Sequence, residues 1–397
     1  MSELSFHVSS RSRTFPVFLV ALGAGVAIYG LLAQPERTWP NLLLDGFYVA
    51  SMGISAVFFL AVTRAAGARW SANLRRVPEA LSSILPAAGV LLALMFFGRQ
   101  TLFPWTRPGY FAKASAIAGN VHYLNPPWAL ARMALTLAAW IFFAWLFRRT
   151  SLQQDREANS SLALHHRLNR YGVVFLLAFA LTFTFAVYDW LLSLDPQWSS
   201  TMFAFYTFAG TFVQGIAGVT LAVVLLKERG TLTKVSEHQL HDLGKMLFAF
   251  TIFWAYIWTC QYLLIWYGNI PDEITHYLTR TNGPWLYLFA LNFILNWIVP
   301  FTTLLTIRAK RNTKVLKMVC VVVLVGHWLD LYMLIMPSMW RTPKIGLIEI
   351  PIAAGYGALA YLIFVRTLQK APLAPLHDPI VAYEQVQQVY AAELHTS

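Results

Sequence analysis

Residues 318–337 read MVCVVVLVGHWLDLYMLIMP, and this stretch decides the class of fold. As a helix rising about 1.5 Å per residue, it is long enough to cross about 30 Å of hydrocarbon. Only His327 and Asp330 interrupt its apolar run. An open strand would leave backbone groups unpaired in lipid, so a helix is expected. The stretch therefore predicts a membrane-spanning helix with a titratable pair inside it.

The same composition extends over the whole chain of 397 residues. Hydrophobic residues make up 57% and charged residues 12%, against about 25% charged in an ordinary soluble domain. This is too little charge to cover the surface of a soluble enzyme of this size, which excludes that class. We predict an all-α membrane protein with ten transmembrane helices, at residues 16–33, 41–65, 77–97, 127–148, 172–194, 201–226, 243–267, 284–307, 315–336 and 347–368.

Lys and Arg residues set the orientation of the predicted spans. With both termini in the cytoplasm, 22 of the 30 Lys and Arg residues fall on the cytoplasmic side, as the positive-inside rule requires. The outer side keeps the other eight, which are Arg37, Arg99, Arg107, Lys113, Arg132, Arg280, Arg341 and Lys344. This asymmetry accounts for the net charge of +12 without a nucleic-acid partner. We expect a multi-pass protein of a bacterial cytoplasmic (inner) membrane, surrounded by the lipid bilayer.

Two segments outside the predicted spans carry further expectations. Residues 98–126 form the longest outer loop and are rich in aromatic residues. They either form an interfacial aromatic belt or pack against a partner. The polar tail after Lys370 contains a short amphipathic stretch, 380–394, which is expected on the cytoplasmic surface or on another subunit.

No cofactor or metal motif occurs in the sequence. The two cysteines, Cys260 and Cys320, lie in apolar stretches, and neither CxxCH nor GxxxxGK[ST] is present. A haem held by two histidines needs one histidine on each of two facing helices. Of ten histidines, only His327 lies deep in a predicted span. We therefore expect this chain to bind no metal and no cofactor of its own.

His327 and Asp330 are the strongest candidate site. Residues three apart share a helix face, and Asp330 is expected about 5 Å nearer the outside than His327. Ionisable groups at this depth are costly and commonly mark proton or ion pathways. The alternative is a static buried pair that fixes the packing of helices.

Polar residues approach this pair from both membrane faces. The predicted inner half-path runs through Glu79, Ser82, Ser83, His241, Asp242 and Lys245. The first three form one helix face that ends at an expected kink at Pro86. For the last three, the alternative is helix capping and anchoring at the membrane surface. With His327 as the centre and Asp330 and Asp189 as the outer half-path, the pattern predicts two aqueous half-channels.

The outer side holds several more polar candidates. Asp189 either passes protons outward or simply reaches interfacial water. Asp45 and Arg132 lie at similar depth on the second and fourth spans and form a candidate charge pair. A quinol site needs an acid or histidine that accepts a hydroxyl proton, and Asp189, Asp45 and His122 are the candidates for that role.

Three further polar residues have structural interpretations. Glu349 begins the tenth span and is expected to be a solvated acid at a helix N-terminus. Asn292 and Asn296 form an amide stripe in the eighth span, just before Pro300. Hydrogen bonds to other helices are the expected role of that stripe.

Several stretches resemble a known family. Residues 187–204 read VYDWLLSLDPQWSSTMFA, and residues 241–250 read HDLGKMLFAF. The sequence WAY at 254–256 is followed by QYLLIWY at 261–267. These stretches resemble the ActF-type membrane subunits of Alternative Complex III, which belong to the NrfD-like (polysulfide-reductase-C-like) proteins, and the similarity extends over nearly the whole chain.

The resemblance implies a fold with internal duplication. Two four-helix bundles, spans 2–5 and 6–9, are flanked by the first and last helices. The implied divisions are 1–40 for the cytoplasmic N-terminus and first span, 41–195 and 196–337 for the two bundles, 338–370 for the tenth span and 371–397 for a cytoplasmic tail.

The resemblance also implies partners. The family's complexes oxidise a quinol, menaquinol or ubiquinol, and pass electrons to a periplasmic acceptor. The implied partners are a second NrfD-like membrane subunit, an iron–sulfur subunit and c-type haem subunits, so the haem and iron–sulfur clusters belong to partner chains. The main quinol site is expected in the second NrfD-like subunit.

Three functions remain open from the sequence. The first is a proton-conducting or coupling subunit of a quinol-oxidising complex, which the two-sided polar pattern and the resemblance favour. The second is a subunit with its own quinol site. The third is an independent secondary transporter, for which interrupted spans at Pro86 and Pro300 are suitable but no substrate motif is present.

Overall fold

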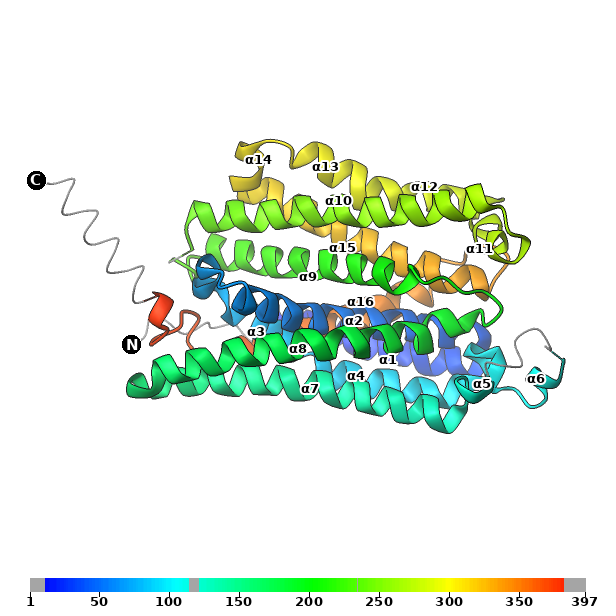
Figure 1. Ribbon diagram of the computed structural model, residues 1–397, viewed down its shortest axis with the longest axis horizontal. Coiled ribbons are helices and arrows are strands. Elements are labelled where there is room, and N and C mark those ends of the chain that lie inside the picture. The colour runs from blue at the N-terminus through cyan, green and yellow to red at the C-terminus, as the bar shows by residue number, and fades with distance from the viewer. Residues whose placement is uncertain (1–10, 114–120, 234, 382–397) are drawn as a thin grey trace, which may run out of the picture.

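The computed structural model describes residues 11–113, 121–233 and 235–381 (Figure 1). Within these ranges the chain is predominantly helical and contains no β-strand. Ten helical stretches are long and apolar enough to cross a membrane, which confirms the predicted all-α class and the number of spans. They are Arg13–Ala33, Pro35–Ala65, Arg76–Leu102, Pro126–Arg156, Ser161–Leu194, Phe203–Glu228, Glu237–Gly268, Trp285–Thr303, Thr313–Ser338 and Glu349–Leu368.

Sixteen α-helices are described, because two of these stretches are divided and three shorter helices, α6, α11 and α14, lie outside them. They are α1 (Arg11–Ala33), α2 (Pro35–Ala65), α3 (Arg76–Ser82), α4 (Leu85–Leu94), α5 (Arg99–Leu102), α6 (Tyr110–Lys113), α7 (Pro126–Arg156), α8 (Ser161–Trp190), α9 (Phe203–Glu228), α10 (Glu237–Gly268), α11 (Pro271–Thr281), α12 (Trp285–Phe293), α13 (Val299–Thr303), α14 (Ile307–Arg311), α15 (Thr313–Ile335) and α16 (Glu349–Leu368).

The long helices lie side by side, with α2 and α9 in the interior (Figure 1). Helix α2 packs against α3, α4 and α8, and also against α9. Helix α9 in turn packs against α10 and α15, while α1 pairs with α16. The burial of α2 and α9 on several sides explains why their sequences contain few charged residues.

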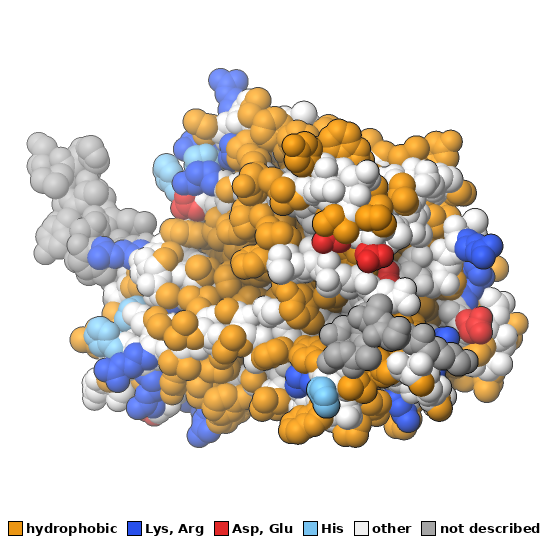
Figure 2. All heavy atoms as spheres, turned by 45° about the vertical axis from the view of Figure 1, so that its right-hand side comes forward, with side chains coloured by type: hydrophobic (Ala, Val, Ile, Leu, Met, Phe, Trp, Pro, Cys, Tyr) orange, Lys and Arg blue, Asp and Glu red, His pale blue; other side chains and the backbone are white. Residues whose placement is uncertain are grey.

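The two ends of the helix assembly differ. At one end, Arg13 near the start of α1 donates a 2.7 Å hydrogen bond to Gln369 just after α16. We call this end, on the left of Figure 1, the termini end. We call the opposite end, where α5, α6 and α11 lie, the loop end. Figure 2 shows hydrophobic side chains over much of the surface between the ends, with Lys and Arg gathered mainly toward the termini end.

Two of the ten stretches are interrupted. Helix α3 ends at Ser82 and α4 begins at Leu85, so the kink predicted near Pro86 is present. In the eighth stretch a π-helical turn, Ile294–Ile298, joins α12 to α13 just before Pro300. Such turns widen the helix locally and often occur at functional sites.

The loop end holds structure that the hydropathy pattern does not indicate. Helix α11 follows α10 directly, and its buried faces include His276 and Arg280. In the aromatic loop 98–126, Trp105 is buried against the core, whereas His122 is exposed. This loop is therefore partly folded into the chain's own core, although residues 114–120 lie outside the described ranges.

The start of the C-terminal tail packs on the termini end. Leu373 and Val381 are buried, and the Asp378 carboxylate is almost fully enclosed. Up to residue 381 the tail packs against this chain itself, and its expected position on the cytoplasmic surface or on another subunit stays a prediction. Most of the predicted amphipathic stretch 380–394 lies outside the described residues.

Candidate functional site

Helix α15 brings His327 and Asp330 together in the interior of the protein. Each residue is only 1% exposed. The distance from His327 Nδ1 to Asp330 Oδ2 is 3.6 Å, as the three-residue spacing predicts. The pair therefore exists as a close contact between two titratable side chains within a span.

Three other helices supply hydrogen bonds to the Asp330 carboxylate. Tyr206 of α9 donates its hydroxyl to Oδ1, and Asn292 of α12 donates to the same oxygen over 2.8 Å. Trp254 of α10 donates its indole N–H to Oδ2 over 3.1 Å. An ionised carboxylate only accepts hydrogen bonds, so three neutral donors suit its charged form. The arrangement therefore fixes the orientation of the Asp330 carboxyl group through donors from three other helices.

Glycine allows α9 and α12 to approach this site closely. A Cβ atom on Gly210 of α9 would lie 2.7 Å from His327 Cε1. On α15 itself, a Cβ on Gly326 would lie 2.9 Å from the side-chain oxygen of Asn296. Any larger residue at either position would push the facing group away, so both glycines set the geometry of the site.

The imidazole of His327 keeps its hydrogen-bonding capacity unused. Neither ring nitrogen has a hydrogen-bond partner among the described residues. The ring of Tyr48 on α2 lies 6.2 Å from it, centroid to centroid, and the Tyr48 hydroxyl donates to the Leu324 carbonyl instead. His327 is therefore available to exchange a proton with Asp330 or with a small donor or acceptor.

The amide stripe of the eighth span makes the predicted kind of hydrogen bond to another helix, and its partner there is Asp330. Asn292 reaches across to α15, and Asn296 donates to the Asn292 side-chain oxygen over 2.7 Å. Asn296 lies within the π-helical turn Ile294–Ile298, and Asn292 lies just before this turn, in α12. The stripe therefore orients the amide that holds the carboxylate.

Asp45 lies close to the pair, on the loop-end side. It is 2% exposed, and its Oδ1 accepts a 2.8 Å hydrogen bond from the indole of Trp328, the neighbour of His327 in sequence. Its second oxygen has no partner among the described residues. The predicted charge pair between Asp45 and Arg132 is wrong, because Arg132 has a different partner.

That partner is Asp189. The Arg132 guanidinium donates to both carboxylate oxygens of Asp189, over 2.7 and 2.9 Å. It also donates to the Tyr123 carbonyl over 3.0 Å and stacks over the Tyr123 ring at 4.1 Å. Two-pronged pairing of this kind fixes both side chains strongly. Asp189 and Asp330 share no hydrogen-bonding partner among the described residues.

Glu349 is buried rather than solvated, so that expectation is wrong. It is 0% exposed and pairs with Arg37 through two hydrogen bonds, of 2.7 and 2.8 Å. Asn41 donates a further bond of 3.3 Å to the same carboxylate. The sequence pattern could not indicate this pairing, because Arg37 and Glu349 lie 312 positions apart.

The predicted inner residues divide into two separate sets. Glu79 pairs with Arg76 at 2.6 Å, while Ser82 and Ser83 donate to backbone carbonyls of their own helix. Lys245 and Asp242 form an exposed pair at 2.6 Å, and His241 lies beside them at the start of α10. The second set therefore has the geometry of a solvated helix start.

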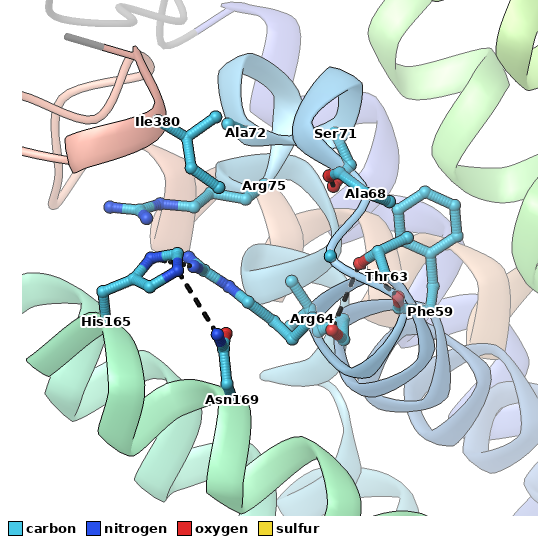
Figure 3. A pocket seen from close by; sticks show the side chains of 12 residues that line it. Phe59, Thr63, Arg64, Ala68, Ser71, Ala72, Arg75, His165, Asn169 and Ile380 are labelled. Carbon is cyan, nitrogen blue, oxygen red and sulfur yellow. Dashed lines mark hydrogen bonds between the residues drawn. The ribbon is translucent and has the colours of Figure 1, made fainter. Parts of the chain in front are cut away.

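Glu79 belongs to a buried ionic group that we call the termini-end cluster. Its members are Arg64, Arg75, Arg76, Glu79, Asp155 and Asp378. Figure 3 shows its pocket, with Arg64 and Arg75 on one side, His165 and Asn169 of α8 on another and Ile380 of the tail above them. Three guanidinium groups face three carboxylates, so the buried charge balances.

Asp378 fastens the C-terminal tail into this cluster. It forms ion pairs with Arg75 and, over 3.3 Å, with Arg64. Burial by itself would raise the pKa of the Asp378 carboxyl, but Arg75 and Arg64 outweigh it and hold the pKa below its ordinary value. Burial and the charge of Arg64 lower the pKa of Arg75 to about 10. Both groups therefore remain charged at neutral pH.

At the loop end, Arg280 clamps α11 to the end of α15. Its guanidinium donates to the carbonyls of His276, Met333 and Leu334, over 2.8 to 3.0 Å. A cation at a helix C-terminus interacts favourably with the helix dipole. Burial lowers the pKa of Arg280 to about 10, so the group stays charged. His276, stacked 3.7 Å above Trp198, has a lowered pKa because of burial and the Arg280 charge.

The residues that hold the central pair from other helices carry no signal in the sequence. Tyr206 and Trp254 belong to stretches that read as ordinary apolar spans, and only the assembled helices bring them to Asp330. Asp378 and Arg280 were likewise treated as tail and loop residues. His122, in the outer loop, is exposed. Among the described residues, no group of three or more His, Cys, Asp and Glu side chains is arranged to hold a metal ion.

A scan of the chain against protein-family models finds no match, and a search of curated proteins finds no similar sequence. Function must therefore be argued from the site itself.

Proposed function

We propose that this protein is an ActF-type, NrfD-like membrane subunit of a quinol-oxidising complex like Alternative Complex III. In this role it moves protons through a centre at His327 and Asp330, while electrons pass through partner chains. Its partners are a second NrfD-like subunit, an iron–sulfur subunit and c-type haem subunits.

The observation that carries the proton role is the state of the central pair. The Asp330 carboxylate, held by three neutral donors, lies 3.6 Å from an imidazole whose two nitrogens have no hydrogen-bond partner among the described residues. Charged groups inside a membrane are costly and are usually retained for ion or proton movement. An imidazole can both accept and donate a proton, and its contact with the Asp330 carboxyl group places a second proton-exchanging group beside it.

The packing of the helices supports the two-bundle interpretation. Helices α2, α3, α4, α7 and α8 pack with one another, and so do α9, α10, α12, α13 and α15. Helices α1 and α16 pair outside these groups and contact α2. We take the two groups as the two four-helix bundles of the NrfD-like fold. The basic termini end then faces the cytoplasm of the bacterial cell.

For the outer half of the path, the contacts favour Asp45 over Asp189. Asp45 is linked to Trp328, next to His327, and has a free carboxylate oxygen. Asp189 is held by two hydrogen bonds from Arg132. A carboxylate in such a pair gives up its charge only at a large cost, so it is a poor relay.

For the inner half, polar side chains line the contact between α2 and α9. Gln214 donates to the Tyr48 carbonyl over 2.9 Å and accepts a hydrogen bond from Ser51. Tyr48 lies beside His327, so this group continues from the centre toward the termini end. Glu79, Ser82 and Ser83 on α3 are the proposed cytoplasmic start of the path, with His241, Asp242 and Lys245 as a second surface site.

The proposal is tested with the complex purified from its native membrane and reconstituted in vesicles. The subunit is expected to purify with proteins that contain c-type haem and iron–sulfur clusters. His327→Phe and Asp330→Asn are expected to retain most quinol oxidation and to lower the number of protons released per electron. Arg132→Lys, outside the path, serves as the control. Isolation of the chain alone, or an unchanged proton-to-electron ratio in both variants with the complex intact, would refute the proposal.

A further inference from the structure

A crevice is lined mainly by residues of α2, α9 and α16. It has a volume of about 300 Å³. Its walls are apolar and include Met52, Leu81, Ala222, Ala360 and Phe364. All these residues except Leu81 lie on the long helices α2, α9 and α16, in stretches that can cross a membrane. The crevice therefore faces the hydrocarbon region and not water.

Small residues keep the crevice open. A Cβ atom on Gly357 of α16 would meet nothing within 4 Å. Other small residues line both walls of the crevice, namely Gly218 and Ala222 on α9 and Ala360 on α16. An unfilled apolar groove of this kind loses dispersion contacts along its whole length, so a flexible apolar molecule of matching shape would restore them.

The length of the crevice suits one hydrocarbon chain. Along α9 its lining extends from Gly218 to Arg229, which is roughly 16 Å at about 1.5 Å per residue. Its inner end is closed by Tyr48 and Leu324, whose hydroxyl and carbonyl groups bond to each other. Among the described residues that line the crevice, the charged one, Arg229, lies at the opposite end.

The other end of the crevice carries a free positive charge. Arg229 follows the last residue of α9, lines the crevice and is exposed. Its side chain makes no hydrogen bond or ion pair with a described residue. Its neighbours differ, because Lys227 donates to the Val235 carbonyl and Glu228 pairs with Lys317 at 2.7 Å. A guanidinium at the end of a span is placed to meet a phosphate at headgroup depth.

We propose that this crevice binds one anionic phospholipid. One acyl chain lies between α9 and α16, and the phosphate is held by Arg229. This inference is independent of the proton path. The end of the acyl chain would lie against Tyr48 and would cover the side of the protein next to His327. An anionic lipid fits better than a zwitterionic one, because a positively charged second group on the headgroup would be repelled by Arg229.

A second apolar crevice provides an internal control. It has about 420 Å³, lies between α8, α9 and α10, and is lined by Ala180, Phe183, Ala204, Phe208 and others. No charged residue occurs among the described residues that line it. We expect it to hold hydrocarbon without preference for a headgroup.

Native mass spectrometry of the purified complex tests the proposal. After delipidation, the protein is titrated with phosphatidylglycerol or with phosphatidylcholine of the same acyl chains. We expect one phosphatidylglycerol per copy of this chain and roughly tenfold weaker retention of phosphatidylcholine, because Arg229 repels the choline cation although both lipids carry the phosphate. Arg229→Gln should remove the preference. Gly357→Leu, which fills open space, should remove the bound lipid, and Ala222→Leu should do the same.

The matched control is Ala180→Leu in the second crevice, which should leave phosphatidylglycerol retention unchanged. Equal retention of the two lipids by the wild-type protein would overturn the proposal. So would equal losses in Gly357→Leu and Ala180→Leu, or a preference that survives Arg229→Gln. Recovery of a quinone that disappears in Gly357→Leu would assign the crevice to a quinol tail instead, and would leave the role of His327 to the proton measurements.

Discussion

Replacing Asp378 with asparagine isolates the contribution of the tail to stability. In the folded protein this carboxylate is 1% exposed and compensates Arg75, which is 3% exposed. Arg64 makes a second ion pair with it at 3.3 Å. Asparagine has nearly the same shape but no charge, so the substitution leaves a buried guanidinium without its closest partner.

The size of the effect follows from the surrounding charges. Two unit charges about 4 Å apart interact by about 4 kcal/mol at an effective dielectric constant near 20. Removing one partner of a buried pair typically costs about 3–5 kcal/mol. Glu79 and Asp155 lie 3.9 and 3.8 Å from Arg75 and still offset part of its charge. We therefore expect a loss of about 3 kcal/mol, which lowers the melting temperature of a chain this long by roughly 4 °C.

Thermal unfolding in detergent, followed by tryptophan fluorescence, measures this loss. The matched control is Glu36→Gln, since Glu36 is an exposed acid in the first turn of α2 and its loss should shift the melting temperature by less than about 1 °C. Adding Arg75→Met to Asp378→Asn should recover part of the stability, because the unpaired charge is removed. If Asp378→Asn and Glu36→Gln melt together, the tail is not held by this ion pair and the reasoning fails.

The same pair predicts a dependence on pH. The pKa of Asp378 is lower in the folded protein than its ordinary value, because Arg75 and Arg64 outweigh the effect of burial. The stabilisation is therefore fully present above the ordinary carboxyl pKa, and it is lost as the pH falls through the lowered value. The difference in melting temperature between the wild-type protein and Asp378→Asn should be constant from pH 6 to pH 8 and shrink below about pH 4. A difference that grows on acidification would contradict the assigned sign.

Three further substitutions test contacts elsewhere in the protein. Gly210→Ala forces a Cβ to within 2.7 Å of the central imidazole and should destabilise the protein by about 1–3 kcal/mol. The control is Gly25→Ala, whose Cβ meets nothing within 4 Å and which should leave stability unchanged. Equal melting temperatures of the two variants would argue against the close approach at Gly210. Arg280→Lys keeps the charge but loses the fork that reaches three carbonyls, so proteolysis near α11 should become faster at unchanged net charge. Arg132→Gln should lower the free energy of unfolding by about 3 kcal/mol, because it leaves the buried Asp189 charge unpaired. Adding Asp189→Asn should restore part of that loss. If the two residues acted independently, the double variant would recover no stability.

The sequence by itself determines the ten spans and the most buried titratable pair. Apolar stretches long enough to cross hydrocarbon can satisfy their backbone groups only as helices, so length and composition are sufficient to place them. The three-residue spacing of His327 and Asp330 places both on one face of any α-helix. The break near Pro86 likewise follows from the chemistry of a single residue.

The tertiary structure alone decides which polar groups meet. Arg132 pairs with Asp189 and not with Asp45, Glu349 is enclosed by Arg37, and Asp330 gathers donors from three other helices. Each of these contacts depends on the depth and rotation of one helix against another. The depth and rotation of each helix are set by close packing at glycines and by hydrogen bonds such as those of Arg280. Many weak contacts between residues far apart in the chain contribute to them together. A local pattern of residues indicates which side of a helix is polar, but it does not contain the position of the neighbouring helix that this side will face.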